Sequence, residues 1–223
     1  MLDQQTPFVA PEKDTPVKRA NRSLLIGLIV ICVCIEAVLQ LADLGLIGPA
    51  RLRALSYEYA GFWPGLLRNW TPNYAFQPQT MFFSYGFLHS GLLHLIINMV
   101  TLWSLGIEVL RRVGNRGFMM LYIMSILGGA AGFALLASEL RPMIGASGAL
   151  FGLAGGLLAW HYVDRYSAQQ KLLPVVQGVV LLILLNVVLW WAMQGQLAWE
   201  THLGGFVAGW VMALLIDPRP RVK

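Results

Sequence analysis

Two short motifs in the apolar part of the chain contain a nucleophile and a base. The first is Gly145-x-Ser147-Gly148, and the second begins at His202 and continues in the pattern HxxGxxxG. A serine hydroxyl is a weak nucleophile until a base removes its proton, and a neutral imidazole can accept that proton near neutral pH. These residue types therefore permit serine hydrolysis, with Ser147 as the nucleophile and His202 as the general base and acid.

The negative charge that develops on a substrate carbonyl during such a reaction needs hydrogen-bond donors. Ser147 is expected in the first turn of its helix, where backbone N–H groups are free and the helix dipole is positive. His94 and Asn98 lie one turn apart and supply side-chain donors. Each donor of this kind is worth roughly 2.7–4 kcal/mol in soluble proteases. We predict an oxyanion hole formed by His94, Asn98 and the backbone N–H of Ser147.

The predicted base has no carboxylate partner in the pattern. Glu200 lies two residues from His202, which places it on a different face of the helix. The sequence therefore predicts a Ser–His dyad. Phe151 lies one turn after Ser147 on the same helix face. We expect its ring to pack against the imidazole and to fix the orientation of the base.

These residues lie in a chain with too little charge for a soluble domain. Of its 223 residues, 57% are hydrophobic and 12% are charged, whereas soluble domains average about 25% charged residues. The basic residues form no patch, which argues against nucleic-acid binding. Long uncharged stretches predict an all-α polytopic membrane protein with a six-helix bundle, because a span needs about 20 apolar residues. The predicted spans are roughly 23–42, 81–106, 117–137, 146–163, 173–193 and 200–216.

The distribution of Lys and Arg predicts the orientation in the membrane. With the N-terminus inside, 12 of the 16 Lys and Arg residues lie on the cytoplasmic side and 4 lie outside. Both termini are therefore expected in the cytoplasm. The first apolar run lacks a small-residue cleavage site, so we interpret it as a retained span. The expected division is a disordered tail at 1–22, a membrane domain at 23–217 and a cytoplasmic tail at 218–223.

In this orientation the second, fourth and sixth spans all begin at the outer face. A single Ser or His in a membrane helix most often serves packing. Here five polar side chains from three spans fall in the outer half of the membrane, and this convergence favours a functional cavity. The five are His89, His94, Asn98, Ser147 and His202.

Small residues recur at every fourth position on two of these spans. Such faces let helix backbones approach closely in a membrane. If the two faces pack together, the nucleophile and the base meet near the outer ends of their helices. The faces consist of Gly148, Gly152 and Gly156 on one span and of Gly205 and Gly209 on the other.

The longest connection, 43–80, is expected to lie at the membrane interface. It contains four prolines and many aromatic residues, and its apolar residues from Leu52 to Leu66 recur at helical spacing. The segment is either a generic interfacial loop or a structured element that shapes access to the site. Glu36, inside the first span, either snorkels outward or pairs with a donor from this loop.

Taken together, the motifs resemble the rhomboid family of intramembrane serine proteases, over about residues 23–217. They occur in the family's order and on the second, fourth and sixth spans. The long first loop and the cytoplasmic N-terminus also match. The motifs are His89-x4-His94-x3-Asn98, Gly145-x-Ser147-Gly148 and His202-x2-Gly205-x3-Gly209.

The resemblance implies cleavage of transmembrane segments of membrane proteins near the outer face, within the lipid bilayer and without cofactor or metal. The bare six-span form is typical of bacterial members, which implies the inner (plasma) membrane. Substrate identity and oligomeric state stay open. Phe151 stands where the family often has a Tyr stacked on the base. The implied supporting residues are His89, Gly145, Gly148, Phe151, Gly205 and Gly209.

One departure and two alternatives accompany this prediction. Many rhomboid proteins carry a Trp-Arg pair in the first loop, and here Thr80-Met81 occupy that position. The first alternative is a catalytically inactive relative that binds transmembrane segments. The second is a haem or metal protein with His94 and His202 as ligands.

Overall fold

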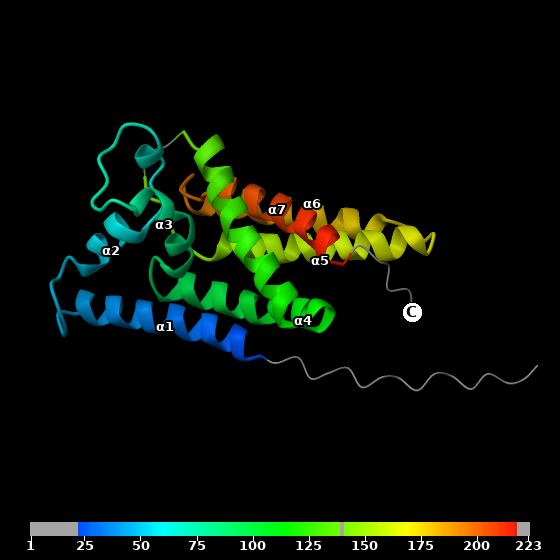
Figure 1. The fold of residues 1–223 in the computed structure, drawn as a ribbon, viewed down its shortest axis with the longest axis horizontal. Coiled ribbons are helices and arrows are strands. Elements are labelled where there is room, and N and C mark those ends of the chain that lie inside the picture. Colours follow the sequence, from blue (N-terminus) through cyan, green and yellow to red (C-terminus); the bar gives the residue numbers. More distant parts are fainter. Residues whose placement is uncertain (1–21, 139–140, 218–223) are drawn as a thin grey trace, which may run out of the picture.

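The computed structural model describes residues 22–138 and 141–217. This part of the chain is all-helical, which confirms the predicted class. It contains seven α-helices and two short 3₁₀ helices (Figure 1). The predicted tails at 1–22 and 218–223 lie outside the described residues, apart from Arg22. The elements are α1 (Ser23–Asp43), α2 (Leu52–Ala60), η1 (Pro64–Leu67), α3 (Gln77–Ser84), η2 (Tyr85–Phe87), α4 (Leu92–Leu136), α5 (Ser147–Ser167), α6 (Leu173–Ala192) and α7 (Trp199–Ile216).

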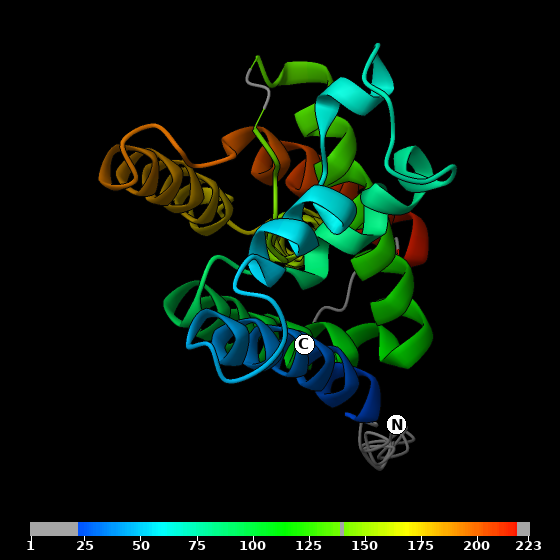
Figure 2. The same cartoon turned by 90° about the vertical axis from the view of Figure 1, so that its left-hand side faces the viewer.

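Helices α4, α5 and α7 form the centre of the molecule, and α1 packs against the first half of α4 (Figure 1). The start of α1 and the end of α7 lie at one end of the bundle, and α2 and α3 lie at the other. Helix α6 stands at the margin in the end-on view (Figure 2). Val175 is its only buried residue, so α6 turns most of its surface to the surroundings.

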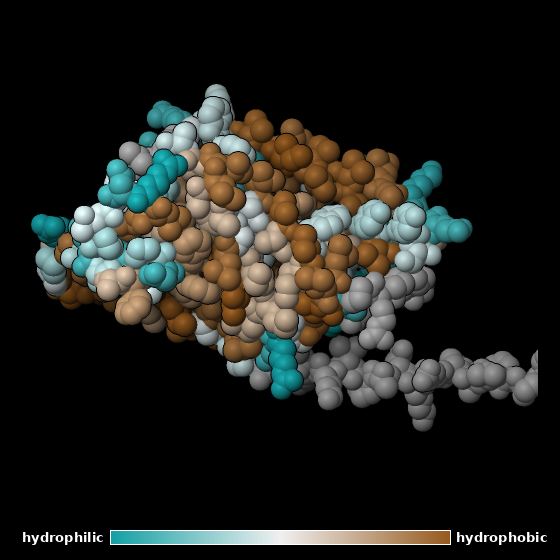
Figure 3. Space-filling model, turned by 45° about the horizontal axis from the view of Figure 1, so that its top comes forward, coloured by the Kyte–Doolittle hydropathy of each residue, from teal (hydrophilic) through white to brown (hydrophobic). Residues whose placement is uncertain are grey.

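The chain is an integral membrane protein. Four described helices, α1, α4, α6 and α7, are long and apolar enough to cross a bilayer. Helix α4 has 45 residues and carries two of the predicted spans, one on each side of a break at Gly114. A band of hydrophobic side chains covers the middle of the molecule, and hydrophilic residues gather toward both ends (Figure 3). This distribution matches a protein that lies across a bilayer.

The predicted span at 81–106 is wrong at its start. Residues 77–84 form the separate helix α3, and α4 begins only at Leu92. The break falls at Gly91, whose φ of +104° is accessible to glycine at little cost and strained for other residues. His89 therefore lies in the connection before α4, not in a membrane helix.

Helices α5 and α7 touch through their glycine faces. A methyl group built on Gly205 would lie 2.8 Å from the carbonyl carbon of Gly148. One on Gly209 would lie 2.5 Å from both the carbonyl carbon and the Cα of Gly152. At these two crossings the absence of a side chain is what lets the backbones meet.

A charged cluster holds the helices together at the end opposite α2 and α3. Arg112, just before the break in α4, forms two hydrogen bonds with Asp164 at the end of α5, at 2.6 and 3.1 Å. It also binds Asp217, which follows α7, at 3.2 Å. Its guanidinium lies 5.0 Å from the ring centre of Trp160. One cation thus ties three helix ends together.

The glycine contact predicts a sharp difference between two Gly→Ala substitutions. Gly209→Ala should lower the free energy of unfolding by about 1–3 kcal/mol or more, because its methyl group collides with the backbone of α5. Gly27→Ala, on α1, is the matched control. No atom of the described residues lies within 4 Å of its added methyl group, and alanine favours helix by up to about 1 kcal/mol. Denaturation in detergent, followed by circular dichroism, measures both. Equal stability of the two variants would contradict the proposed contact.

Candidate active site

Ser147 is the first residue of α5, and the turn before it is held in place from two sides. Met143 forms an isolated antiparallel bridge with Phe62. Gly145 donates its N–H to the carbonyl of Tyr85 at 3.0 Å. The φ of Gly145 is +121°, a conformation that residues with a side chain rarely adopt. The sequence Gly145-x-Ser147 thus places the Ser147 hydroxyl at the N-terminal end of α5.

The structure brings Ser147 and His202 into hydrogen-bond contact. The Nε2 of His202 lies 2.8 Å from the Oγ of Ser147. His202 lies in the first turn of α7 and is 4% exposed. The ring of Phe151 is stacked on the imidazole, with centroids 4.1 Å apart and planes 8° apart. A serine in contact with a neutral imidazole can be deprotonated by it.

Sequence reasoning missed a third residue at this site. Asn186, on α6, has its Oδ1 2.6 Å from the Nδ1 of His202. Both ring nitrogens of His202 therefore have hydrogen-bond partners, Ser147 at Nε2 and Asn186 at Nδ1. The signal in the sequence was a carboxamide within an apolar span, where α6 has only one other carboxamide, Gln177.

His94 lies beside the nucleophile with a defined proton position. The backbone N–H of Ser90 donates to the Nδ1 of His94 at 3.3 Å. Because that nitrogen accepts, the proton of a neutral ring is on Nε2. A methyl group placed on Gly145 would be 3.0 Å from this Nε2 and 3.9 Å from the Oγ of Ser147. The Nε2 of His94 therefore lies against the turn that leads to Ser147, and its N–H is an available donor there.

Asn98 and His89 both contact His94. The Nδ2 of Asn98 donates to the carbonyl of His94 at 2.8 Å, and its buried Oδ1 has no partner among the described residues. His89 is fully buried, and its ring meets that of His94 edge-on, with centroids 5.2 Å apart. The two rings meet because His89 precedes the helix, whereas a continuous helix would have placed them on different faces.

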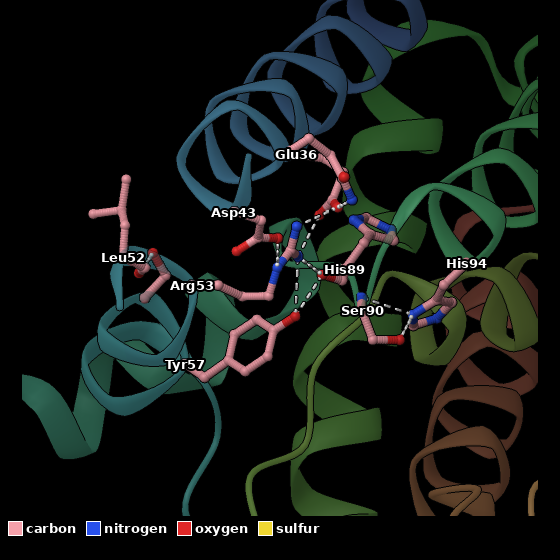
Figure 4. A network of polar contacts seen from close by, with 10 residues as sticks. Glu36, Asp43, Leu52, Arg53, Tyr57, His89, Ser90 and His94 are labelled. Carbon is pink, nitrogen blue, oxygen red and sulfur yellow. Dashed lines mark hydrogen bonds and ion pairs between the residues drawn. The ribbon is translucent and has the colours of Figure 1, made fainter. Parts of the chain in front are cut away.

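Glu36 pairs with a donor from the first loop (Figure 4). It is fully buried, and its carboxylate receives hydrogen bonds from Arg53 at 2.9 and 3.1 Å. Arg53 also binds Asp43 at 2.6 Å and the carbonyl of His89 at 3.1 Å. The hydrogen bonds with Glu36, the largest effect, raise the pKa of Arg53 above its ordinary value. Tyr57 donates to the same carbonyl at 2.8 Å.

This network gives the first loop a structure and an anchor. Arg53 lies on α2 and links this helix to Glu36 and Asp43 of α1. It also links α2 to the carbonyl of His89, which precedes α4. The position at which the resemblance implies a Trp-Arg pair is filled by Thr80-Met81, and Arg53 binds α1 from a different part of the loop. The loop is therefore a structured element and not a generic interfacial connection.

The fold and the site define a helical membrane protein with a Ser–His pair at one end of its bundle. Comparisons with known proteins identify its family. The Rhomboid domain family matches residues 77–219. The chain belongs to the rhomboid family, which confirms the resemblance seen in the motifs. Helices α1 and α2 precede the matched residues.

Named relatives agree with this family. The chain is 32% identical over 135 residues to RHOMBOID-like protein 5 of Arabidopsis thaliana, covering 60% of this chain and 43% of that protein. It is 35% identical over 137 residues to RHOMBOID-like protein 4 of the same plant, covering 61% and 34%. It is 32% identical over 127 residues to Rhomboid protease GluP of Bacillus subtilis (strain 168), covering 56% and 24%. The aligned part spans less than half the length of each of these relatives.

The Arg53 network predicts a thermodynamic coupling between α1 and α2. Arg53→Met should lower the free energy of unfolding by about 2–4 kcal/mol, because the buried carboxylate of Glu36 loses its partner. The double variant with Glu36→Gln should recover part of this loss, since neither charge is then left alone. Arg51→Met, at an exposed neighbouring position, is the control and should stay within about 0.5 kcal/mol. Detergent denaturation of the wild type, Arg53→Met, Glu36→Gln and the double variant gives the coupling energy, and strictly additive losses would contradict the pairing.

Proposed function

We propose that this protein is an intramembrane serine endopeptidase of the rhomboid type that cleaves transmembrane segments of membrane proteins near the outer face. The observation that carries the proposal is the 2.8 Å contact between Ser147 and His202 in a chain of the rhomboid family. Both residues lie in the first turn of their helices, at the end of the bundle where α2 and α3 lie, and this end is proposed to be the outer one.

In the proposed reaction, His202 removes the proton of Ser147 while the oxygen attacks the peptide carbonyl carbon. The resulting oxyanion accepts hydrogen bonds from the backbone N–H of Ser147, from the Nε2–H of His94 and from Asn98. The peptide C–N bond then breaks, and the leaving amine takes the proton from His202. A water molecule, deprotonated by His202 in turn, hydrolyses the acyl-enzyme and releases Ser147.

The proposed setting is a bilayer crossed six times. The two halves of α4 and helices α1, α5, α6 and α7 supply six helical segments within the domain 23–217. The excess of Lys and Arg on one side supports cytoplasmic termini, and the six-span form supports the bacterial inner membrane. Substrates are then proteins with a transmembrane segment that unwinds near the outer face.

Ser147→Ala should abolish cleavage of a single-span substrate by the purified protein in detergent. Ser167→Ala changes the same residue type at the exposed far end of α5 and should cleave at the wild-type rate. A fluorophosphonate probe should label the wild type and the Ser167→Ala protein at Ser147, and should not label Ser147→Ala. Equal cleavage by the wild type and Ser147→Ala would refute the proposal. A wild type that neither cleaves nor reacts with the probe would favour an inactive binder of transmembrane segments.

The oxyanion hole is tested separately by substitution of its side-chain donors. His94→Ala and Asn98→Ala should each lower kcat by about 10²–10³-fold, with a smaller effect on KM, because each donor acts on charge that appears only in the transition state. Steady-state kinetics on the same substrate measure both parameters. A kcat within twofold of the wild type would exclude the residue concerned from the hole.

A further inference from the structure

We propose that Asn186 is a positioning residue for the base and that the catalytic group is a Ser147–His202–Asn186 triad. This inference rests on the proposed function and extends it to a residue outside the family motifs. Its origin is the 2.6 Å contact between the Oδ1 of Asn186 and the Nδ1 of His202.

The orientation of the Asn186 carboxamide is fixed by its own helix. Its Nδ2 donates to the carbonyl of Leu182, one turn earlier in α6, at 3.0 Å. A carbonyl oxygen can only accept, so the nitrogen of the carboxamide must face Leu182 and the oxygen must face His202. The imidazole therefore meets a hydrogen-bond acceptor at Nδ1.

An acceptor at Nδ1 determines where the imidazole carries its proton. A neutral ring has one N–H, and the hydrogen bond to Asn186 places it on Nδ1. The Nε2 then has a free lone pair, and it lies 2.8 Å from the hydroxyl of Ser147. With the opposite tautomer, Nε2 would carry a hydrogen and could not accept the serine proton. Asn186 thus selects the form of His202 that can act as a base.

No other described residue hydrogen-bonds to the Nδ1 of His202. The ring has Ser147 at Nε2, Phe151 on one face and Asn186 at Nδ1. Phe151 holds the plane of the ring but cannot distinguish the two tautomers, because its contact is not a hydrogen bond. Control of the tautomer therefore falls to Asn186.

The surroundings of Asn186 allow its effect on the base to be measured apart from any effect on protein stability. The residue is half-buried on a helix whose only buried residue is Val175. Replacement of its carboxamide by an apolar group of similar size leaves a side chain suited to the apolar surroundings of α6. Loss of the hydrogen bond should therefore change the reaction without unfolding the protein.

Asn186→Leu should lower kcat by about 10–100-fold and leave KM nearly unchanged, since the acceptor acts on the base and not on substrate binding. Asn186→Ala should lower kcat to a similar extent, which would show that the effect does not come from the leucine side chain itself. Asn186→Asp keeps an acceptor oxygen at the same place and should retain activity well above both. Gln177→Leu, which removes an exposed carboxamide from the same helix, is the control and should match the wild type.

A spectroscopic measurement reads the tautomer without any turnover. In protein labelled with ¹⁵N-histidine, the His202 resonances, assigned with His202→Ala, should show a protonated Nδ1 and an unprotonated Nε2. Asn186→Leu should show a mixture of tautomers, whereas Gln177→Leu should not. Thermal denaturation should give the same midpoint for all these variants within a few degrees.

The outcomes distinguish this inference from the proposed function. If Asn186→Leu keeps kcat within twofold of the wild type while Ser147→Ala is inactive, the triad is wrong and the protease stands. If Asn186→Leu loses activity but its His202 tautomer is that of the wild type, the positioning role is likewise refuted. If Ser147→Ala is as active as the wild type, the proposed function fails, and the ¹⁵N spectra still decide whether Asn186 sets the tautomer.

Discussion

The backbones of α5 and α7 touch at glycines, and the geometry of the reacting groups depends on that contact. Ser147 precedes Gly148 directly, and His202 lies three residues before Gly205, so the hydroxyl and the imidazole extend from the crossing itself. A side chain at the crossing would move the helix axes apart by more than the tolerance of a 2.8 Å hydrogen bond. Helix association in lipid gains little from the hydrophobic effect and relies on close packing. The same contact therefore stabilises the bundle and sets the distance between nucleophile and base.

A second constraint is that polar groups inside an apolar bundle need partners from other elements. Glu36 of α1 is paired with Arg53 of α2, and Arg112 of α4 is paired with Asp164 of α5. Each pair joins two different helices and lies near one end of the bundle. Because a buried charge without its partner costs several kcal/mol, these pairs fix the relative position of the helices they join. The glycine contact holds α5 against α7, and the charged pairs fix helices at the two ends of the bundle.

Much of this arrangement could be predicted from the sequence, because periodic patterns indicate local structure and the helix faces that pack. The four-residue spacing of glycines from Gly148 and from Gly205 predicted two faces that pack, and the structure packs them. The start of α4 could not be predicted in the same way. Gly91 lies in a long uncharged stretch, and the Ser90-Gly91 pair is too weak a turn signal to separate a glycine within a helix from one with positive φ that precedes it.

The contact of Asn186 was missed for a different reason. Helix α6 is apolar on all sides and has no small-residue face, so its sequence does not reveal which side meets α7. The position of Asn186 next to His202 depends on the angle and rotation between two helices, which are tertiary quantities. The same holds for Arg53, whose partner Glu36 is 17 residues earlier on another helix. A polar residue in a span indicates that a partner exists, but not which one.

The choice of a carboxamide beside His202 follows from the surroundings of the site. A carboxylate would set the same tautomer and would stabilise the protonated imidazole more strongly, but it would bring a negative charge next to lipid, where an unpaired charge is costly. Asn186 supplies the acceptor without a charge. The positive charge that His202 gains in the proposed reaction then lies against the face of Phe151 at 4.1 Å, where the ring quadrupole attracts a cation. Two neutral side chains thus share what one carboxylate does in a soluble protease: Asn186 places the proton, and Phe151 stabilises the cation.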